Sequence, residues 1–200
     1  MASRTALSAL VLAVVGSAPT SAQVQAVTLF AHGGGYSTLY HAYNLNTGSV
    51  DDFKTGFILG GGVGLQLHRY LEIRASLTGA QTHLLVSGAP TTAYLNRYYV
   101  GVDAKLQYPL PSGVTPYGLA GGGGVVLYEK GTTGQSKTQG FGHLGAGLSY
   151  PIQQGLSVFV QGDGYFYSLS GFSGGALSSA YSSAQFDIAW SAGASFKLPL

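Results

Sequence analysis

Apolar and polar residues alternate through several long segments of this chain, and each segment ends at a turn. The clearest is 71–78, where one parity holds Leu71, Ile73, Ala75 and Leu77 and the other holds Glu72, Arg74, Ser76 and Thr78. Successive side chains of a β-strand point to opposite faces, so such a strand has one apolar face and one charged face. The alternation recurs over 97–108, 156–163 and 185–198. The pattern predicts an all-β chain and leaves open which face looks outward.

The low charge of the chain bears on that choice. Only 8% of the 200 residues are Asp, Glu, Lys or Arg, whereas soluble domains carry about 25%. A soluble, lipocalin-like barrel with its apolar face around a ligand is the alternative arrangement. Its outer wall would hold far fewer charges than a water-facing surface needs. We therefore expect the apolar face to contact lipid. The net charge of +2 gives no indication of a nucleic-acid partner.

The first 22 residues are predicted to be a secretory signal peptide. Arg4 supplies the positive charge, residues 7–15 are apolar, and small residues precede Gln23. That apolar run is shorter than the roughly 20 residues that a membrane helix needs. No later segment is long enough either, so a chain that enters a bilayer must do so as a closed barrel. Residues 23–200 are predicted to form that barrel as one domain.

Turn signals divide the chain into eight candidate strands: 26–36, 56–67, 71–86, 94–108, 115–128, 139–150, 156–169 and 184–198. Three connections are short, at 68–70, 109–114 and 151–155. The connections between them are polar and mostly longer, at 37–55, 87–93, 129–138 and 170–183. Outer-membrane barrels have short periplasmic turns and longer outer loops, and an even strand number leaves both ends periplasmic. The alternation favours an eight-stranded antiparallel up-and-down transmembrane β-barrel.

Aromatic residues mark the borders of the apolar band. Tyr98 and Tyr108 share a parity and lie ten residues apart, which corresponds to about 25 Å along the axis of a tilted barrel. The pair Phe186 and Phe196 repeats this spacing. Tyrosine and tryptophan typically form belts at both membrane surfaces. The predicted girdle residues are Phe57, Tyr98, Tyr108, Tyr117, Tyr150, Phe166, Phe186 and Phe196.

The chain resembles the eight-stranded outer-membrane β-barrel proteins, the OmpA-like transmembrane-domain and OmpX-like porin-superfamily group. The resemblance rests on Gly33-Gly34-Gly35-Tyr36, the hairpin 62–74, and the strands 141–150 and 190–198. It implies export to the periplasm, insertion into the bacterial outer membrane by the barrel-assembly machinery, and lipid as the surrounding partner. It also implies a scaffold whose four outer loops offer sites for adhesion or a surface ligand. The family usually ends in an aromatic residue, whereas this chain ends Phe196-Lys-Leu-Pro-Leu200.

The polar face predicts a charge network inside the barrel. A hairpin of the third and fourth strands in which opposed residue numbers sum to 177 places Glu72 opposite Lys105 and Arg74 opposite Asp103. Enclosed charges need partners, because an unpaired ion away from water costs several kcal/mol. We predict that these four residues, with Asp163 and Asp187, plug the lumen. A small-pore channel with a selectivity ring is the alternative, but side chains about fill an eight-stranded interior.

Catalysis is a further alternative, because some small outer-membrane barrels are lipid A deacylases or acyltransferases. A nucleophile needs a base within hydrogen-bond reach and a group that orients that base. His41 shares a loop with Asp51 and Asp52, and His83 lies near Ser87, but neither spacing matches a catalytic motif. The glycine runs lack the Lys-Ser/Thr of a phosphate loop. We expect no catalytic site, no metal site and no cofactor.

Overall fold

The computed structural model describes residues 24–39, 42–43, 50–86, 89–130, 136–168 and 184–200. Eight long antiparallel strands form the wall of a barrel: β1 (Ala26–Thr38), β4 (Gly56–His68), β5 (Leu71–Val86), β6 (Ala89–Gln107), β7 (Thr115–Lys130), β8 (Ser136–Gln153), β9 (Leu156–Ser168) and β10 (Ala184–Pro199). Two short strands, β2 (Ala42–Tyr43) and β3 (Val50–Phe53), extend the sheet beside β5. The predicted signal peptide lies outside the described residues.

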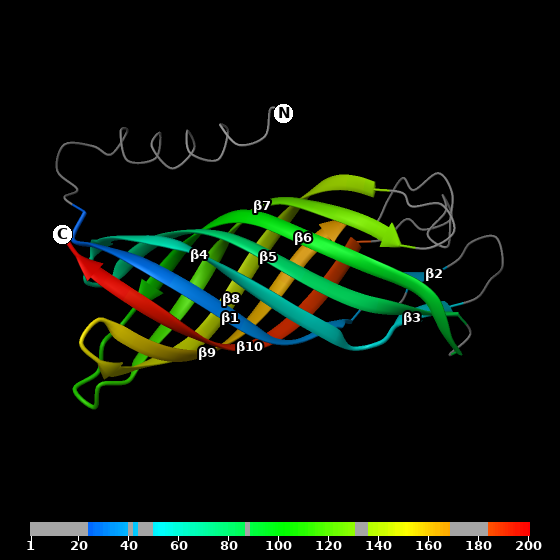
Figure 1. Ribbon diagram of the computed structural model, residues 1–200. Helices are drawn as coiled ribbons and strands as arrows, with labels where there is room; N and C mark the ends of the chain where they lie inside the picture. The colour runs from blue at the N-terminus through cyan, green and yellow to red at the C-terminus, as the bar shows by residue number, and fades with distance from the viewer. Residues whose placement is uncertain (1–23, 40–41, 44–49, 87–88, 131–135, 169–183) are drawn as a thin grey trace, which may run out of the picture.

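The barrel closes where its first and last long strands meet. β1 pairs with β10 along its whole length, from Ala26 opposite Pro199 to Thr38 opposite Asp187. Figure 1 shows this seam as the blue and red strands running side by side, with both strand ends at the end of the barrel opposite β2 and β3. A closed barrel pairs every strand on both sides and leaves no edge. The predicted fold is confirmed.

Two of the turns depend on glycine. Gly113, between β6 and β7, has a φ of 85°, and Gly155, between β8 and β9, has a φ of 80°. This left-handed backbone region excludes most other residues. The turn between β4 and β5 consists of Arg69 and Tyr70. These three connections lie at the end of the barrel where β1 begins and β10 ends, which we call the turn end. The opposite end is the loop end.

The predicted loop 87–93 is mostly strand. β6 begins at Ala89, and Val86 and Leu85 pair with Ala89 and Pro90. The segment lacks the apolar alternation that marks the other strands, so its sequence gave no strand signal. Backbone pairing with β5 nevertheless continues past the aromatic residues that border the apolar band. The hairpin of β5 and β6 is therefore longer than the sequence predicted.

The apolar parity faces outward. Along β6, Tyr99, Asp103 and Lys105 are buried in the barrel, whereas Val100 and Leu106 are exposed on its wall. The same holds on β5, where Glu72 and Arg74 are buried and Leu77 is exposed, as in the predicted arrangement. No helix among the described residues is long and apolar enough to cross a membrane.

The interior is less polar than the alternation predicted. In the loop half of the barrel, inward side chains form an apolar and aromatic cluster that includes Ile58, Leu95, Val125, Leu127 and Tyr165. A smaller cluster in the turn half contains Tyr117, Leu119 and Phe159, with Phe30 packed against it. β7 contributes to both because its inward face is apolar near both ends of the strand. The lumen is filled by a core in which charged residues are embedded.

Candidate functional site

The turn half of the lumen holds a charge cluster on β5 and β6. The two strands pair in the predicted register, so Glu72 lies opposite Lys105 and Arg74 opposite Asp103. The ion pairs only partly follow that register. Glu72 Oε1 accepts from Arg74 Nε at 2.7 Å, and Glu72 Oε2 lies 3.8 Å from Lys105 Nζ. Glu72 therefore neutralises two cations, while the carboxylate of Asp103 has a different partner.

Tyr117 belongs to this cluster, and its predicted place in the outer girdle is wrong. Its side chain is only 6% exposed and points into the lumen. The ring centre lies 4.5 Å from Lys105 Nζ and 5.8 Å from Arg74 Cζ. The hydroxyl donates a hydrogen bond to Gln161 Oε1 at 2.9 Å. The inward position of Tyr117 is not predictable from the sequence, because glycines and apolar residues occupy both parities of β7.

The middle of the lumen is crossed by a chain of hydrogen bonds centred on His143. His143 Nδ1 lies 2.7 Å from Asp103 Oδ1, and Nε2 lies 2.9 Å from Asp163 Oδ1. Because both ring nitrogens face carboxylate oxygens, the geometry fits the imidazolium form, which donates from both. Gln161 Nε2 donates to the same Asp163 carboxylate at 2.8 Å. β6, β8 and β9 are thereby joined across the lumen.

Glycines opposite these charged residues give them room. Gly64 faces Arg74, Gly121 faces Asp103, and Gly145 faces Asp163 on the adjacent strands. A Cβ atom on Gly145 would lie 2.5 Å from Asp163 Oδ1, and Cβ atoms on Gly64 and Gly121 would overlap with the carboxylates of Glu72 and Asp103. The glycine content of the chain is thus partly explained by the volume of its buried charges.

The loop half of the lumen contains a second ion pair. Arg97 Nε lies 3.4 Å from Asp187 Oδ2, and both side chains are completely buried. Arg97 also donates to the Tyr167 hydroxyl and to Thr82 Oγ1, each at 2.7 Å. Asp187 Oδ2 accepts from three tyrosine hydroxyls, those of Tyr36, Tyr99 at 3.4 Å and Tyr167 at 2.6 Å. Neither Arg97 nor these tyrosines were among the predicted network residues.

An aromatic layer separates the two polar regions. The Tyr165 ring stacks on His143 with centres 4.8 Å apart, and on Tyr99 with centres 4.5 Å apart. Phe141 meets the Tyr99 ring edge-on at 5.0 Å. Between this layer and the turn half, the lumen keeps a cavity of about 20 Å³ beside His32, enough for about one water molecule.

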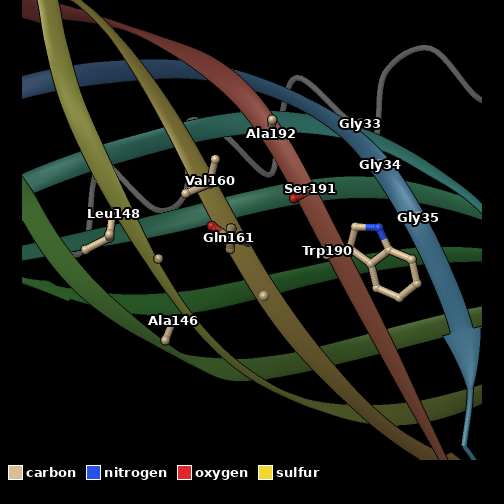
Figure 2. Close-up of a pocket in the computed structure, with 12 residues that line it drawn as sticks. Gly33, Gly34, Gly35, Ala146, Leu148, Val160, Gln161, Trp190, Ser191 and Ala192 are labelled. Atoms are coloured by element: carbon tan, nitrogen blue, oxygen red, sulfur yellow. The ribbon is translucent and has the colours of Figure 1, made fainter.

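The predicted girdle residues other than Tyr117 lie on the outer wall. Phe57, Tyr98, Tyr108, Tyr150, Phe166 and Phe196 are exposed there. Phe186 is half-buried because its ring stacks on that of Phe166, with centres 4.5 Å apart. Between the girdles the wall carries a groove of about 570 Å³ where Gly33 and Gly35 meet Trp190, Ala192 and Val160 (Figure 2). Its floor is made of small residues of the β1–β10 seam.

The histidines considered for catalysis are dispersed. His41 and Ser87 lie outside the described residues, as do the side chains of Asp51 and Asp52. The His83 ring packs on Tyr94 at the loop end, with centres 4.2 Å apart. His68 packs beside Tyr70 at the turn end. The described part of the barrel therefore places His68 and His83 at opposite ends of the molecule.

Comparison with known families decides where such a barrel belongs. A family profile described as "Outer membrane protein beta-barrel domain" matches residues 8–168. The chain belongs to this family. It is therefore a protein of the bacterial outer membrane, and its exposed apolar wall contacts the lipid of that membrane.

Solved structures share the fold of this outer-membrane barrel. Neisserial surface protein A is 15% identical, with a TM-score of 0.56 over 86% of this chain and 96% of its own. The N-terminal barrel domain of Pseudomonas aeruginosa OprF is 16% identical, with a TM-score of 0.53 over 88% of this chain and 100% of its own. OprG of the same organism is 13% identical, with a TM-score of 0.54 over 88% and 98%. No curated protein matches this chain in sequence.

Proposed function

We propose that this protein is a structural outer-membrane barrel with a closed lumen, which holds its outer loops at the membrane surface. The observation that carries this proposal is the aromatic layer of Tyr99, Phe141 and Tyr165 between two hydrogen-bonded polar clusters. An ion that enters from either end meets this layer after displacing buried ion pairs. Both steps are costly in a narrow interior of low dielectric constant.

The cross-links also support a structural role. The Asp103–His143–Asp163 chain joins β6, β8 and β9, and the Arg97–Asp187 pair joins β6 to β10. Each cluster thus connects strands that are not neighbours in the wall. Removal of one member leaves a buried charge with fewer partners, so we expect the clusters to fix one barrel cross-section. This is the role we propose for Asp103, Asp163 and Asp187. For Glu72, Arg74 and Lys105, on the neighbouring strands β5 and β6, we propose mutual neutralisation of buried charge.

Single-protein recordings in planar lipid bilayers test the closed lumen. The wild-type barrel is expected to show no steady conductance, because the layer excludes ions. The double variant Tyr99→Ala, Tyr165→Ala removes two rings of the layer and is expected to show open events. Tyr98→Ala with Tyr150→Ala, which removes two rings from the outer wall, is the matched control. Steady large conductance of the wild type would establish the small-pore channel instead.

The four connections at the loop end, 39–55, 87–88, 131–135 and 169–183, are the proposed surfaces for adhesion or a ligand. We further propose that the protein is not an enzyme; in support, the two described histidines at the barrel ends, His68 and His83, lie at opposite ends. Lipid analysis of membranes with and without the protein checks this. An altered lipid A or phospholipid acyl pattern would favour a deacylase or acyltransferase. Heat-modifiable gel migration with surface proteolysis confined to the loop end would support the scaffold.

A further inference from the structure

The turn between β4 and β5 places a cation over two stacked rings at the turn end of the barrel. The guanidinium carbon of Arg69 lies 4.3 Å from the centre of the Tyr70 ring. The Tyr70 ring stacks on that of Tyr108, with centres 5.8 Å apart and an angle of 10° between the planes. A guanidinium that lies over a ring keeps its N–H donors at its edge, where they can meet an anion. We call these three residues the rim layer.

Hydrogen bonds fix the rim layer against the neighbouring strand. The Gln107 backbone N–H donates to the Tyr70 carbonyl at 2.9 Å, and Gln107 Nε2 donates to the Arg69 carbonyl at 3.2 Å. The Tyr108 N–H donates to the Pro116 carbonyl at 2.9 Å. The rim layer is thus held on β6 through the turn and on β7 through Tyr108, so binding there costs little ordering of the chain.

An apolar groove of about 530 Å³ starts at the rim layer and runs along Leu106, Pro116 and Gly118. Leu106 and Tyr108 are 64% and 60% exposed on the outer wall. Gly118 lies opposite Leu106. A Cβ atom added to Gly118 would have one neighbour within 4 Å among the described residues, the Gly145 carbonyl oxygen at 3.8 Å. The groove is open because this position on the lipid-facing wall has no side chain.

The charge near the groove is positive. Among the described residues at the turn end, one has an acidic side chain. This residue, Glu72, is buried in the lumen and bonded to Arg74. Arg69 is exposed on the outside of the barrel. An exposed guanidinium beside an apolar groove matches a molecule that joins a phosphate to a hydrocarbon chain. Tyrosine rings at this depth suit the headgroup region between the two.

We propose that the rim layer and this groove bind one anionic glycerophospholipid of the surrounding leaflet. Its phosphate lies against the Arg69 guanidinium, and one acyl chain lies in the groove over Gly118. The Tyr70 and Tyr108 rings contact the glycerol region between them. This site requires a membrane-spanning barrel but not a closed lumen, so it is independent of the proposed function.

Native mass spectrometry of the full chain in micelles with equal amounts of phosphatidylglycerol and phosphatidylcholine tests the proposal. The wild type is expected to retain one lipid molecule, with phosphatidylglycerol preferred. Arg69→Gln is expected to lower that preference about fivefold, the effect of one basic residue near a membrane surface. Lys197→Gln, which removes another exposed cation at the turn end, is expected to leave the preference unchanged.

A second pair of variants tests the groove. Gly118→Leu fills it and is expected to abolish the retained lipid. Gly142→Leu adds the same side chain to the lipid-facing wall where a Cβ atom would meet no described atom within 4 Å, and is expected to retain the lipid. Heat-modifiable gel migration checks that each variant is folded. Should Gly118→Leu fail to fold, Tyr70→Ala, which removes the ring under Arg69, is expected to reproduce the Arg69→Gln result.

Three outcomes would overturn the proposal. Equal effects of Arg69→Gln and Lys197→Gln would show a general effect of charge at the turn end. A lipid count unchanged in folded Gly118→Leu would show that the groove holds no acyl chain. A two-copy species that Gly118→Leu abolishes would show that a second copy of the chain occupies the groove.

Discussion

Neutralising Asp187 should destabilise the barrel more than any change at its surface. The Asp187 carboxylate is completely buried, lies 3.4 Å from Arg97 Nε and accepts hydrogen bonds from Tyr36, Tyr99 and Tyr167. Asp187→Asn keeps the size and one acceptor oxygen but removes the negative charge beside a buried guanidinium. Removing one partner of a buried ion pair costs about 3–5 kcal/mol. Because Asn retains an acceptor, we expect a loss of about 3 kcal/mol in the free energy of unfolding.

Urea unfolding in lipid vesicles measures this loss. Trp190 is the only tryptophan of the chain and stands on the lipid-facing wall, so its fluorescence reports loss of the barrel. Lys54→Gln, which removes a charge from an exposed position, is the control, and it should change the unfolding free energy by less than about 0.5 kcal/mol.

A double variant separates the ion pair from general disruption. Arg97→Met combined with Asp187→Asn removes both charges together. The pair is then replaced rather than broken, so the double variant should lose clearly less than the sum of the two single losses. A loss below about 1 kcal/mol for Asp187→Asn, or strict additivity in the cycle, would refute the reasoning.

Three further predictions concern the packing of the wall and lumen. Gly145→Ala places a methyl group against Asp163 and should lower the free energy of unfolding by about 1–3 kcal/mol. Gly142→Ala on the same strand should be nearly neutral. Similar unfolding midpoints of the two variants in heat-modifiable gels would contradict the crowding argument. Tyr117→Phe should cost about 1 kcal/mol through the lost hydrogen bond to Gln161, and Tyr150→Phe on the outer wall should cost little. Equal urea midpoints for these two variants would place Tyr117 outside. Trp190, 52% exposed on the wall, should be quenched by phospholipids with brominated acyl chains and hardly by aqueous acrylamide; the reverse result would place it in water.

The predictable parts of the fold are the strands whose two faces meet different surroundings, lipid on one side and the polar lumen on the other. Alternation at 71–78 and 97–108 gave the register of β5 and β6, because a shift by one residue would turn Glu72 and Lys105 toward lipid. Where both parities carry glycine or apolar residues, as around Tyr117, the pattern holds no such information. The strand residues 89–93 were missed because they lie beyond the apolar band.

The ion pairs were less predictable than the register. Opposed positions fix which backbones are neighbours, but long side chains reach across the lumen to strands that are distant in the wall. Arg74 turns to Glu72 on its own strand, and Asp103 reaches His143 on β8. On β8 the residues nearest to His143 on the same face are Phe141 and Gly145, neither of which is charged, so its role left no trace in the local sequence. The role of Arg97 is not predictable from local sequence either, because its partner Asp187 is 90 positions away.

The glycines that face the buried charges also constrain how this barrel can change over generations. Gly145 is tolerated because Asp163 fills the space beside it, and Asp163 fits because position 145 has no side chain. Neither residue can be exchanged freely while the other stays. Replacements at 145 and 163, and likewise at 64 and 72, should therefore be inherited as pairs. Among descendants of this chain, an enlarged residue at one member should coincide with the loss of the carboxylate at the other.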